Sequence, residues 1–172
     1  MTESKIVDAA TLEARFEKYP AARKGLVLAN GIFDVLHVGH VRYLEGARAA
    51  GRSLVVAVNS DASARRLKGP GRPVIPLEER LELVAALGSV DWVTWFEDDT
   101  VEPLLRQLRP AVHAKGTDYT EDSVPERAVA RELGIRTVIV GDPKRHASSD
   151  IIRAIQSTTP QGPREAHGSR PR

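Results

Sequence analysis

Two histidines separated by a valine and a glycine are the side chains best placed for chemistry in this sequence. His37 and His40 lie in NGIFDVLHVGH (30–40), which follows the apolar run GLVLAN (25–30). Imidazoles at positions i and i+3 of a helix share a face, and the unpaired amides of a helix N-terminus favour an anion. Gly39 has no side chain, so a phosphate could approach the backbone closely. The stretch therefore predicts a polyphosphate-binding site.

The same histidines could instead serve a structural or a metal-binding role. His37 could cap the helix and His40 could be a half-buried polar residue, with Gly31 and Gly39 serving only turn geometry. A zinc site would need a third ligand, for which Asp34 is the only close candidate. Two histidines with a glycine between them, directly after a strand, favour anion binding, and we expect no metal held by the protein alone.

The elements that must position the histidines follow from hydrophobic periodicity. Five apolar runs are near-continuous, as in parallel strands covered on both faces, and they alternate with segments of helical spacing. The runs are 25–30, 53–59, 90–96, 111–115 and 136–141, and the helical segments between them include 40–51, 76–88, 101–110 and 124–134. This alternation predicts a single α/β domain with a Rossmann-like, doubly wound, five-stranded parallel sheet and helices on both faces. A ligand should bind at the carboxyl ends of the strands, where the strand order reverses.

The two ends of the chain differ from this core. The segment 8–20 predicts an additional amphipathic helix with Leu12, Phe16 and Tyr19 on one face. We expect an N-terminal helical extension over 1–24, the main domain over 25–156 and a disordered tail over 157–172. Within the main domain, Gly51 stands where a left-handed cap would end a helix.

Composition narrows the class of protein. The 172 residues contain no cysteine, which excludes disulfides and thiolate metal sites, and 25 basic against 23 acidic residues give a net charge of +2. Aromatic residues do not alternate with a basic stripe, so no nucleic-acid partner is expected. The first residues lack the apolar core of a signal peptide, and no run approaches the roughly 20 apolar residues of a membrane span. We expect a cytoplasmic protein with no membrane association.

The histidine stretch GIFDVLHVGH resembles the GxFDxxHxGH signature of the nucleotidyltransferase superfamily that includes the cytidylyltransferases. Four further stretches, at 58–87, 90–100, 114–119 and 148–155, are similar to the heptose 1-phosphate adenylyltransferases. The segment RLKGPGRP followed by PLEER points to the heptose branch. The resemblance covers about residues 25–156.

This resemblance implies transfer of AMP from ATP to D-glycero-D-manno-heptose 1-phosphate, giving ADP-heptose and pyrophosphate. It also implies Mg²⁺ bound with ATP, a sugar 1-phosphate as the second substrate, and a homodimer. Two alternatives stay open: a cytidylyltransferase for glycerol 3-phosphate or a related alcohol phosphate, and a nucleotide-binding module without catalysis.

The resemblance also assigns roles to residues. It implies catalytic roles for His37, His40 and Lys68, the last within a loop that folds over the phosphates. The implied nucleotide-binding residues are Gly31, Ile32, Phe33, His37, Gly39, His40, Arg80, Ser148 and Ser149. The implied substrate-binding residues are Asp34, Asn59, Arg72, Lys115 and Asp118.

Simpler roles compete with several of these assignments. Lys68 and Arg72 could belong to a solvated loop, Arg80 could form a surface ion pair, and one of the two serines could only cap its helix. The sequence departs from the pattern of related enzymes in two places. Ala147 precedes the serines where Ser-Thr-Thr is usual, and Thr117 stands where heptose enzymes have a second glycine.

Overall fold

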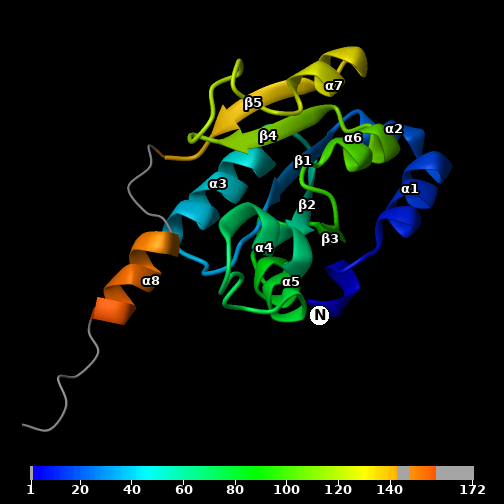
Figure 1. Cartoon of the computed structure of the whole chain (residues 1–172). Helices are drawn as coiled ribbons and strands as arrows, with labels where there is room; N and C mark the ends of the chain where they lie inside the picture. Colours follow the sequence, from blue (N-terminus) through cyan, green and yellow to red (C-terminus); the bar gives the residue numbers. More distant parts are fainter. Residues whose placement is uncertain (1, 143–147, 158–172) are drawn as a thin grey trace, which may run out of the picture.

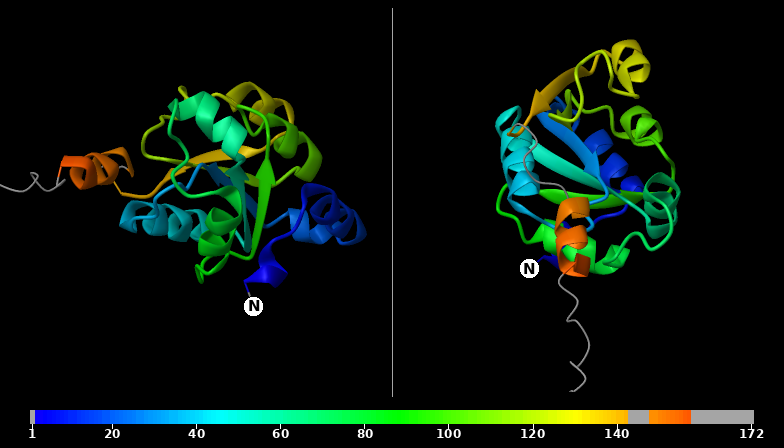
Figure 2. Two further views of the ribbon diagram at one scale, coloured as in Figure 1. Left: turned by 60° about the horizontal axis from the view of Figure 1, so that its bottom comes forward. Right: turned by 60° about the vertical axis from the view of Figure 1, so that its left-hand side comes forward.

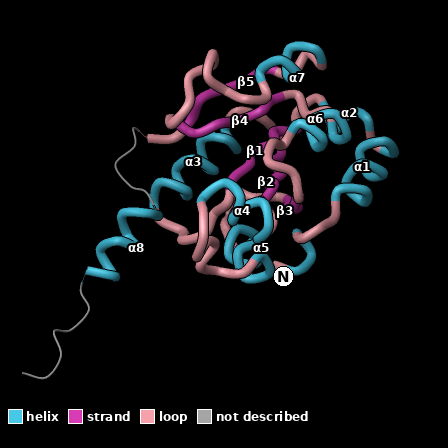
Figure 3. The backbone as a smooth tube through the Cα atoms, in the orientation of Figure 1, coloured by secondary structure: helices cyan, strands magenta, loops and turns pink. Residues whose placement is uncertain are grey.

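Five parallel strands form one sheet in the order β3-β2-β1-β4-β5 (Figures 1 and 3). The computed structural model describes residues 2–142 and 148–157, apart from the side chains of residues 149 and 156. Each strand is built from an apolar run predicted by the sequence. The strands are β1 (Leu26–Gly31), β2 (Ser53–Asn59), β3 (Trp92–Phe96), β4 (Val112–Gly116) and β5 (Arg136–Val140).

Helices connect the strands and flank the sheet. After a short 3₁₀ turn, η1 (Glu3–Lys5), the helices are α1 (Ala9–Lys18), α2 (Pro20–Arg23), α3 (Val38–Ala49), α4 (Asp61–Lys68), α5 (Leu77–Ala85), α6 (Glu102–Leu108), α7 (Arg127–Glu132) and α8 (Ser148–Ser157). None of these described helices has the length and apolar character needed to cross a membrane.

The core has one layer on each face of the sheet, as the continuous apolar strands predict. On one face, Leu44 of α3 and Val84 of α5 pack with Val27 and Val56 of the strands. On the other face, α1, α6 and α7 pack against the alternate strand residues, with Phe16 and Leu105 among the buried side chains. Figure 2 shows the sheet between these two groups of helices. The predicted Rossmann-like fold is confirmed.

The strand order fixes where a ligand can bind. The chain runs outward from β1 through β2 to β3 and then returns to place β4 and β5 on the other side of β1. The order therefore reverses between β1 and β4. Connections diverge there, which leaves a crevice above the carboxyl ends of these strands.

Some details differ from the predictions. Helix α4 was not foreseen, and its last residue is Lys68, which therefore belongs to a helix and not to a loop. Tyr19 is exposed instead of sharing the buried face of Leu12 and Phe16. Of the tail predicted over 157–172, Ser157 is the last residue of α8 and the rest lies outside the described residues, as does the segment 143–147.

Gly51 serves a different purpose from the predicted left-handed cap. The residues with positive φ include Gly134, at +69°, but not Gly51. A Cβ at Gly51 would lie 2.5 Å from Val27 Cγ2 and 2.6 Å from the carbonyl oxygen of Gly25. The glycine is required because helix α3 returns to the sheet through a close backbone approach.

This packing predicts different costs for alanine at two turn glycines. Gly51→Ala should lower the free energy of unfolding by about 1–3 kcal/mol, since backbone must shift to admit the methyl group. Gly88→Ala is the matched control, because a Cβ there meets no atom within 4 Å, and it should leave stability unchanged or slightly raised. Urea unfolding of the two variants checks this; equal midpoints would contradict the close approach.

Candidate active site

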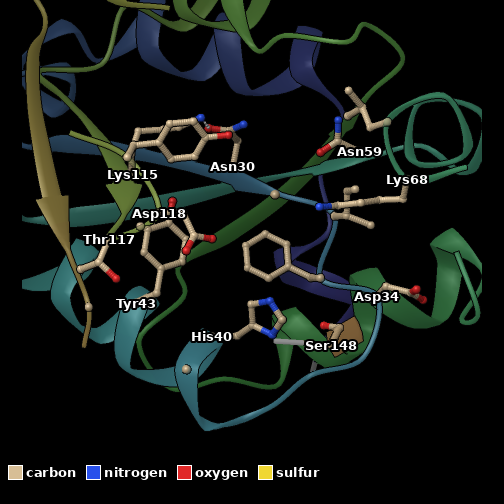
Figure 4. A pocket seen from close by; sticks show the side chains of 18 of the residues that line it. Asn30, Asp34, His40, Tyr43, Asn59, Lys68, Lys115, Thr117, Asp118 and Ser148 are labelled. Atoms are coloured by element: carbon tan, nitrogen blue, oxygen red, sulfur yellow. Dashed lines mark hydrogen bonds between the residues drawn. The ribbon is translucent and has the colours of Figure 1, made fainter. Parts of the chain in front are cut away.

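A cavity of about 750 Å³ opens at the carboxyl edge of the sheet. Its walls come from the ends of β1, β2, β4 and β5, the first turns of α3, the end of α4 and the start of α8. Figure 4 shows side chains from these elements pointing into one space. Of the residues predicted for the site, the lining includes Gly31, Ile32, Phe33, Asp34, His37, Gly39, His40, Asn59, Lys68, Arg72, Lys115, Asp118 and Ser148.

The two histidines meet at the N-terminus of α3. His37 is the cap residue, and its Nδ1 accepts a hydrogen bond from the Gly39 amide at 3.2 Å. The rings of His37 and His40 stack with their centroids 4.0 Å apart. His37 therefore both caps the helix and lines the pocket.

His40 is held as a neutral imidazole. Burial, together with a smaller effect of the nearby His37, lowers its pKa from 6.5 to about 4, and Asp118 acts in the opposite direction. Its Nδ1 is buried and has no hydrogen-bond partner in the described part of the protein. A buried ring nitrogen without a partner costs free energy unless a ligand supplies one.

The backbone conformation before α3 places the Phe33 ring against His40 in the pocket wall. Phe33 has φ of +52°, a left-handed conformation that is rare for a bulky residue. Its ring lies against His40, with centroids 5.3 Å apart. A Cβ on Gly31 would lie 3.1 Å from the Phe33 ring. Gly31 therefore makes room for Phe33, which supports the His40 ring.

Asp34 holds a loop instead of facing the cavity freely. One carboxylate oxygen accepts from Arg72 Nε at 2.6 Å, and the other accepts from the amides of Val74 and Ile75 at 2.7 and 2.9 Å. Asp34 is buried, and Arg72 is largely covered. Both line the pocket, but in this structure their charges neutralise each other.

Arg80 lies outside the pocket lining and is fully buried. Its guanidinium donates to the carbonyl oxygens of Ile32, Asn59 and Ile75 at 2.6–2.9 Å and to Asp61 Oδ1 at 2.6 Å. The structure brings it neither to the nucleotide site nor to the surface ion pair considered as its alternative. Three segments around the pocket, at Ile32, at 59–61 and at Ile75, are instead tied to one planar group.

Lys68 is the pocket cation without a carboxylate partner among the described residues. It reaches into the cavity from the last turn of α4 (Figure 4). Arg42 pairs with Asp142, Arg72 with Asp34, and Lys115 with Glu126. Asn59, at the end of β2, donates to Ser63 Oγ at 2.9 Å, which fixes its amide at the pocket wall.

Lys115 belongs to a buried polar cluster beneath the cavity. Its ammonium lies 3.3 Å from Glu126 Oε2 and 3.5 Å from Asn30 Oδ1, and 4.6 Å from the centre of the Tyr119 ring. His113, the preceding residue of β4 on the same face, has its Nε2 3.1 Å from Asn30 Oδ1. Burial lowers the pKa of Lys115, although Glu126 opposes the effect.

Helix α3 and strand β4 are joined across the crevice. The buried Tyr43 hydroxyl donates to the Ala114 carbonyl oxygen at 2.8 Å. Burial, the largest influence on this phenol, raises the pKa of Tyr43. Two further hydrogen bonds hold the pocket rim: Thr117 Oγ1 donates to the Asp142 carbonyl oxygen at 2.6 Å, and Ser148 Oγ donates to the Val35 carbonyl oxygen at 3.0 Å. The predicted role of Ser149 concerns a side chain outside the described part.

The described acids do not form a metal cage. No group of three or more His, Cys, Asp or Glu side chains among the described residues has a geometry suited to a metal ion. Asp34, the third ligand considered for zinc, already has both oxygens engaged. The family resemblance implies Mg²⁺, and these residues are compatible with an ion held mainly by ATP phosphates and water.

Several pocket residues were not identified from the sequence. They include Asn30, Arg42, Tyr43, Thr117, Tyr119 and Glu126. Asn30 could have been found, because it is a polar residue at the end of a predicted strand at the switch point. Glu126 lies eleven positions after Lys115 in an irregular segment, and no local pattern connects the two.

The sequence of this chain is similar to those of known proteins. Residues 28–161 match the family described as cytidylyltransferase-like. Bifunctional protein HldE of Azotobacter vinelandii is 47% identical over 131 residues, and that of Hahella chejuensis is 57% identical over 99 residues. The alignments cover 76% and 58% of this chain but 28% and 21% of those proteins. The chain thus spans less than a third of the length of these relatives.

Solved structures give a consistent picture. The lipopolysaccharide core biosynthesis protein from Thermoplasma volcanium superposes with a TM-score of 0.61 at 26% identity, over 69% of this chain and 98% of that one. Pantothenate synthetase from Thermus thermophilus gives a TM-score of 0.59 at 22% identity, over 83% and 63%. The second similarity shows the shared fold alone.

The buried guanidinium predicts a large stability effect. Arg80→Ala should lower the free energy of unfolding by about 3–5 kcal/mol, because three carbonyl groups lose their donor. Arg106→Ala is the matched control: this exposed arginine pairs with Glu132 on the surface, and its loss should have little effect. Chemical denaturation checks the difference, and similar midpoints for the two variants would contradict the role assigned to Arg80.

The low pKa of His40 predicts a pH dependence of stability. The folded value of about 4 is below the ordinary 6.5, so the unfolded chain takes up the proton first as pH falls. The stabilising contribution is complete above pH 6.5 and is lost between pH 6.5 and 4, by up to about 3 kcal/mol. His40→Gln should flatten the fall in unfolding free energy over this range. Parallel curves for the variant and the wild type would show that His40 is not responsible.

Proposed function

The chain belongs to the cytidylyltransferase-like family, and on this premise we propose that it transfers AMP from ATP to D-glycero-D-manno-heptose 1-phosphate, releasing pyrophosphate and ADP-heptose. The observation that carries the proposal is the stacked pair His37 and His40 at the N-terminus of α3, facing a cavity at the switch point of the sheet. The stretches that resemble heptose enzymes indicate the acceptor. The 26%-identical structural relative described as a lipopolysaccharide core biosynthesis protein supports a product used for such a glycan.

The proposed reaction requires the protein to align two anions, ATP and the sugar phosphate. It does not require a covalent intermediate with the protein. An oxygen of the sugar phosphate attacks the α-phosphorus of ATP, and the bond from that phosphorus to the pyrophosphate oxygen breaks. The nucleophile is already ionised, so no side chain has to remove a proton from it. The protein supplies donors where negative charge increases on the leaving group.

His40 and Lys68 are suited to that task. A neutral His40 can donate one N–H to a phosphate oxygen, and the anion would raise the imidazole pKa, so that positive charge develops where pyrophosphate leaves. Lys68 is available because no described carboxylate pairs with it. Ser148, at the start of α8, lines the same pocket, and its hydroxyl already donates to the Val35 carbonyl oxygen.

Mg²⁺ bound to ATP would offset part of the phosphate charge. The proposal includes a homodimer, a cytoplasmic location, and ATP and a sugar 1-phosphate as the ligands. Analytical ultracentrifugation would test the dimer.

The direct test is pyrophosphate release in the presence of Mg²⁺. ATP, CTP and GTP are each combined with heptose 1-phosphate in both anomers and with glycerol 3-phosphate. We expect release with ATP and one heptose anomer. Release with CTP and glycerol 3-phosphate would replace the proposal with the cytidylyltransferase alternative. Binding of ATP with no release from any pair would indicate a nucleotide-binding module.

Variants separate catalysis from folding. His40→Ala should lower turnover by at least about 10²-fold, with the melting temperature nearly unchanged, because the ring contributes donors to the pocket more than packing to the core. Lys68→Ala should also lower turnover. Arg65→Ala is its matched control, since Arg65 lies on the same helix, is exposed and does not line the pocket. Wild-type turnover in His40→Ala would refute the catalytic role.

A further inference from the structure

The buried cluster under the pocket contains one titratable side chain with no direct access to a ligand. His113 of β4 has no exposed surface and is absent from the pocket lining. Its Nε2 lies 3.1 Å from Asn30 Oδ1, and its Nδ1 has no partner in the described part of the protein. Asn30, in contrast, lines the cavity at the end of β1. A connection therefore runs from a buried histidine to a pocket residue.

The orientation of the Asn30 amide follows from its neighbours. Lys115 Nζ lies 3.5 Å from the same Oδ1, and an ammonium is only a donor. The reversed amide would place its NH₂ group against this ammonium, donor against donor. Oδ1 must therefore face Lys115 and His113.

The histidine tautomer follows in turn. Because Oδ1 accepts, His113 Nε2 must carry a proton, and its unpartnered Nδ1 must be the bare nitrogen. Burial, with Lys115 adding to the effect, lowers the pKa of His113 to about 4, while Glu126 opposes the shift. The ring is neutral at pH 7, so this tautomer persists there.

We infer that His113 is a positioning residue that acts through Asn30: with Lys115 it holds Asn30 Oδ1, so that Asn30 Nδ2 is presented to the cavity as a donor to an oxygen of a bound substrate. No described group accepts a hydrogen bond from Nδ2, and its two protons are available for a phosphate or sugar oxygen. Both substrates of the proposed reaction carry such oxygens, and the inference rests on that function for the substrate's identity.

The first test changes Asn30 and leaves the buried histidine intact. Asn30→Asp keeps the Oδ1 acceptor for His113 and Lys115 and replaces the Nδ2 donor with an acceptor. It should lower kcat/KM about 10-fold or more. KM is measured separately for ATP and for the sugar phosphate, and the larger increase identifies the substrate that Nδ2 contacts. Wild-type kinetics in Asn30→Asp would overturn the inference.

A matched pair of variants tests His113. His113→Gln places an amide NH₂ near the position of Nε2, and His113→Asn places the same group near Nδ1, too far from Asn30. His113→Gln should retain near-wild-type kinetics, whereas His113→Asn should lose several-fold in kcat/KM. In an Asn30→Ala background, His113→Asn should cause no further loss, because the two residues act as a unit. Equal losses in both backgrounds would mean that His113 acts only through the fold.

A spectroscopic measurement separates this inference from the proposed function. The ¹⁵N chemical shifts of the His113 ring report its tautomer in the protein without substrate. A proton on Nε2 is expected, and a proton on Nδ1 would overturn the geometry even if the enzyme is active. If no substrate pair releases pyrophosphate while Nε2 is protonated, the proposed function fails and the arrangement of Asn30 stands. The affinities of Asn30→Asp for ATP and for heptose 1-phosphate, measured by calorimetry, then test the donor, and unchanged affinity for both would overturn its role.

Discussion

A single guanidinium without exposed surface holds the framework of the pocket together. Arg80 donates to carbonyl oxygens after β1, at the end of β2 and before α5, and pairs with Asp61 at the start of α4. Three segments, at Ile32, at 59–61 and at Ile75, converge here because parallel strands all end at one edge of the sheet. Carbonyl groups at strand ends lack ladder partners, so a planar fork with several donors satisfies them where a lysine could not.

The loop above the pocket is restrained by the same group and by Asp34. The amide of Ile75 donates to Asp34, and its carbonyl oxygen accepts from Arg80 Nε. Arg72 is tied to Asp34 as well. The part left without such restraints is the tip that contains Gly69 and Gly71, both with positive φ and open space around them. Movement of this loop above the pocket is thus limited to a short glycine-containing turn.

Hydrophobic periodicity was sufficient to predict the sheet, because buried parallel strands leave continuous apolar runs in the sequence. Each of the five strands overlaps one of the predicted runs. The histidine pair was likewise recognisable, since helix start, glycine and spacing are local properties. Interactions between residues that are far apart in the sequence could not be recognised in this way. Arg80 and Asp34 look like surface or ligand residues in a linear sequence, and only the folded chain shows that their charges are used internally. Helix α4 was missed because its sequence, DASARRLK, is largely polar and has few apolar residues to show a helical repeat.

The hydrogen bond of the Tyr43 hydroxyl affects whether the pocket walls become ordered during folding or on ligand binding. This buried hydrogen bond to Ala114 joins the helix that carries His40 to the strand that carries Lys115. Separation of these two walls of the crevice would leave the buried Tyr43 hydroxyl without its partner, which costs free energy. The entropy of bringing these walls together is therefore lost when the chain folds and not when substrates arrive. In the proposed reaction, binding energy from the nucleotide and its acceptor is then left for aligning the reacting phosphates.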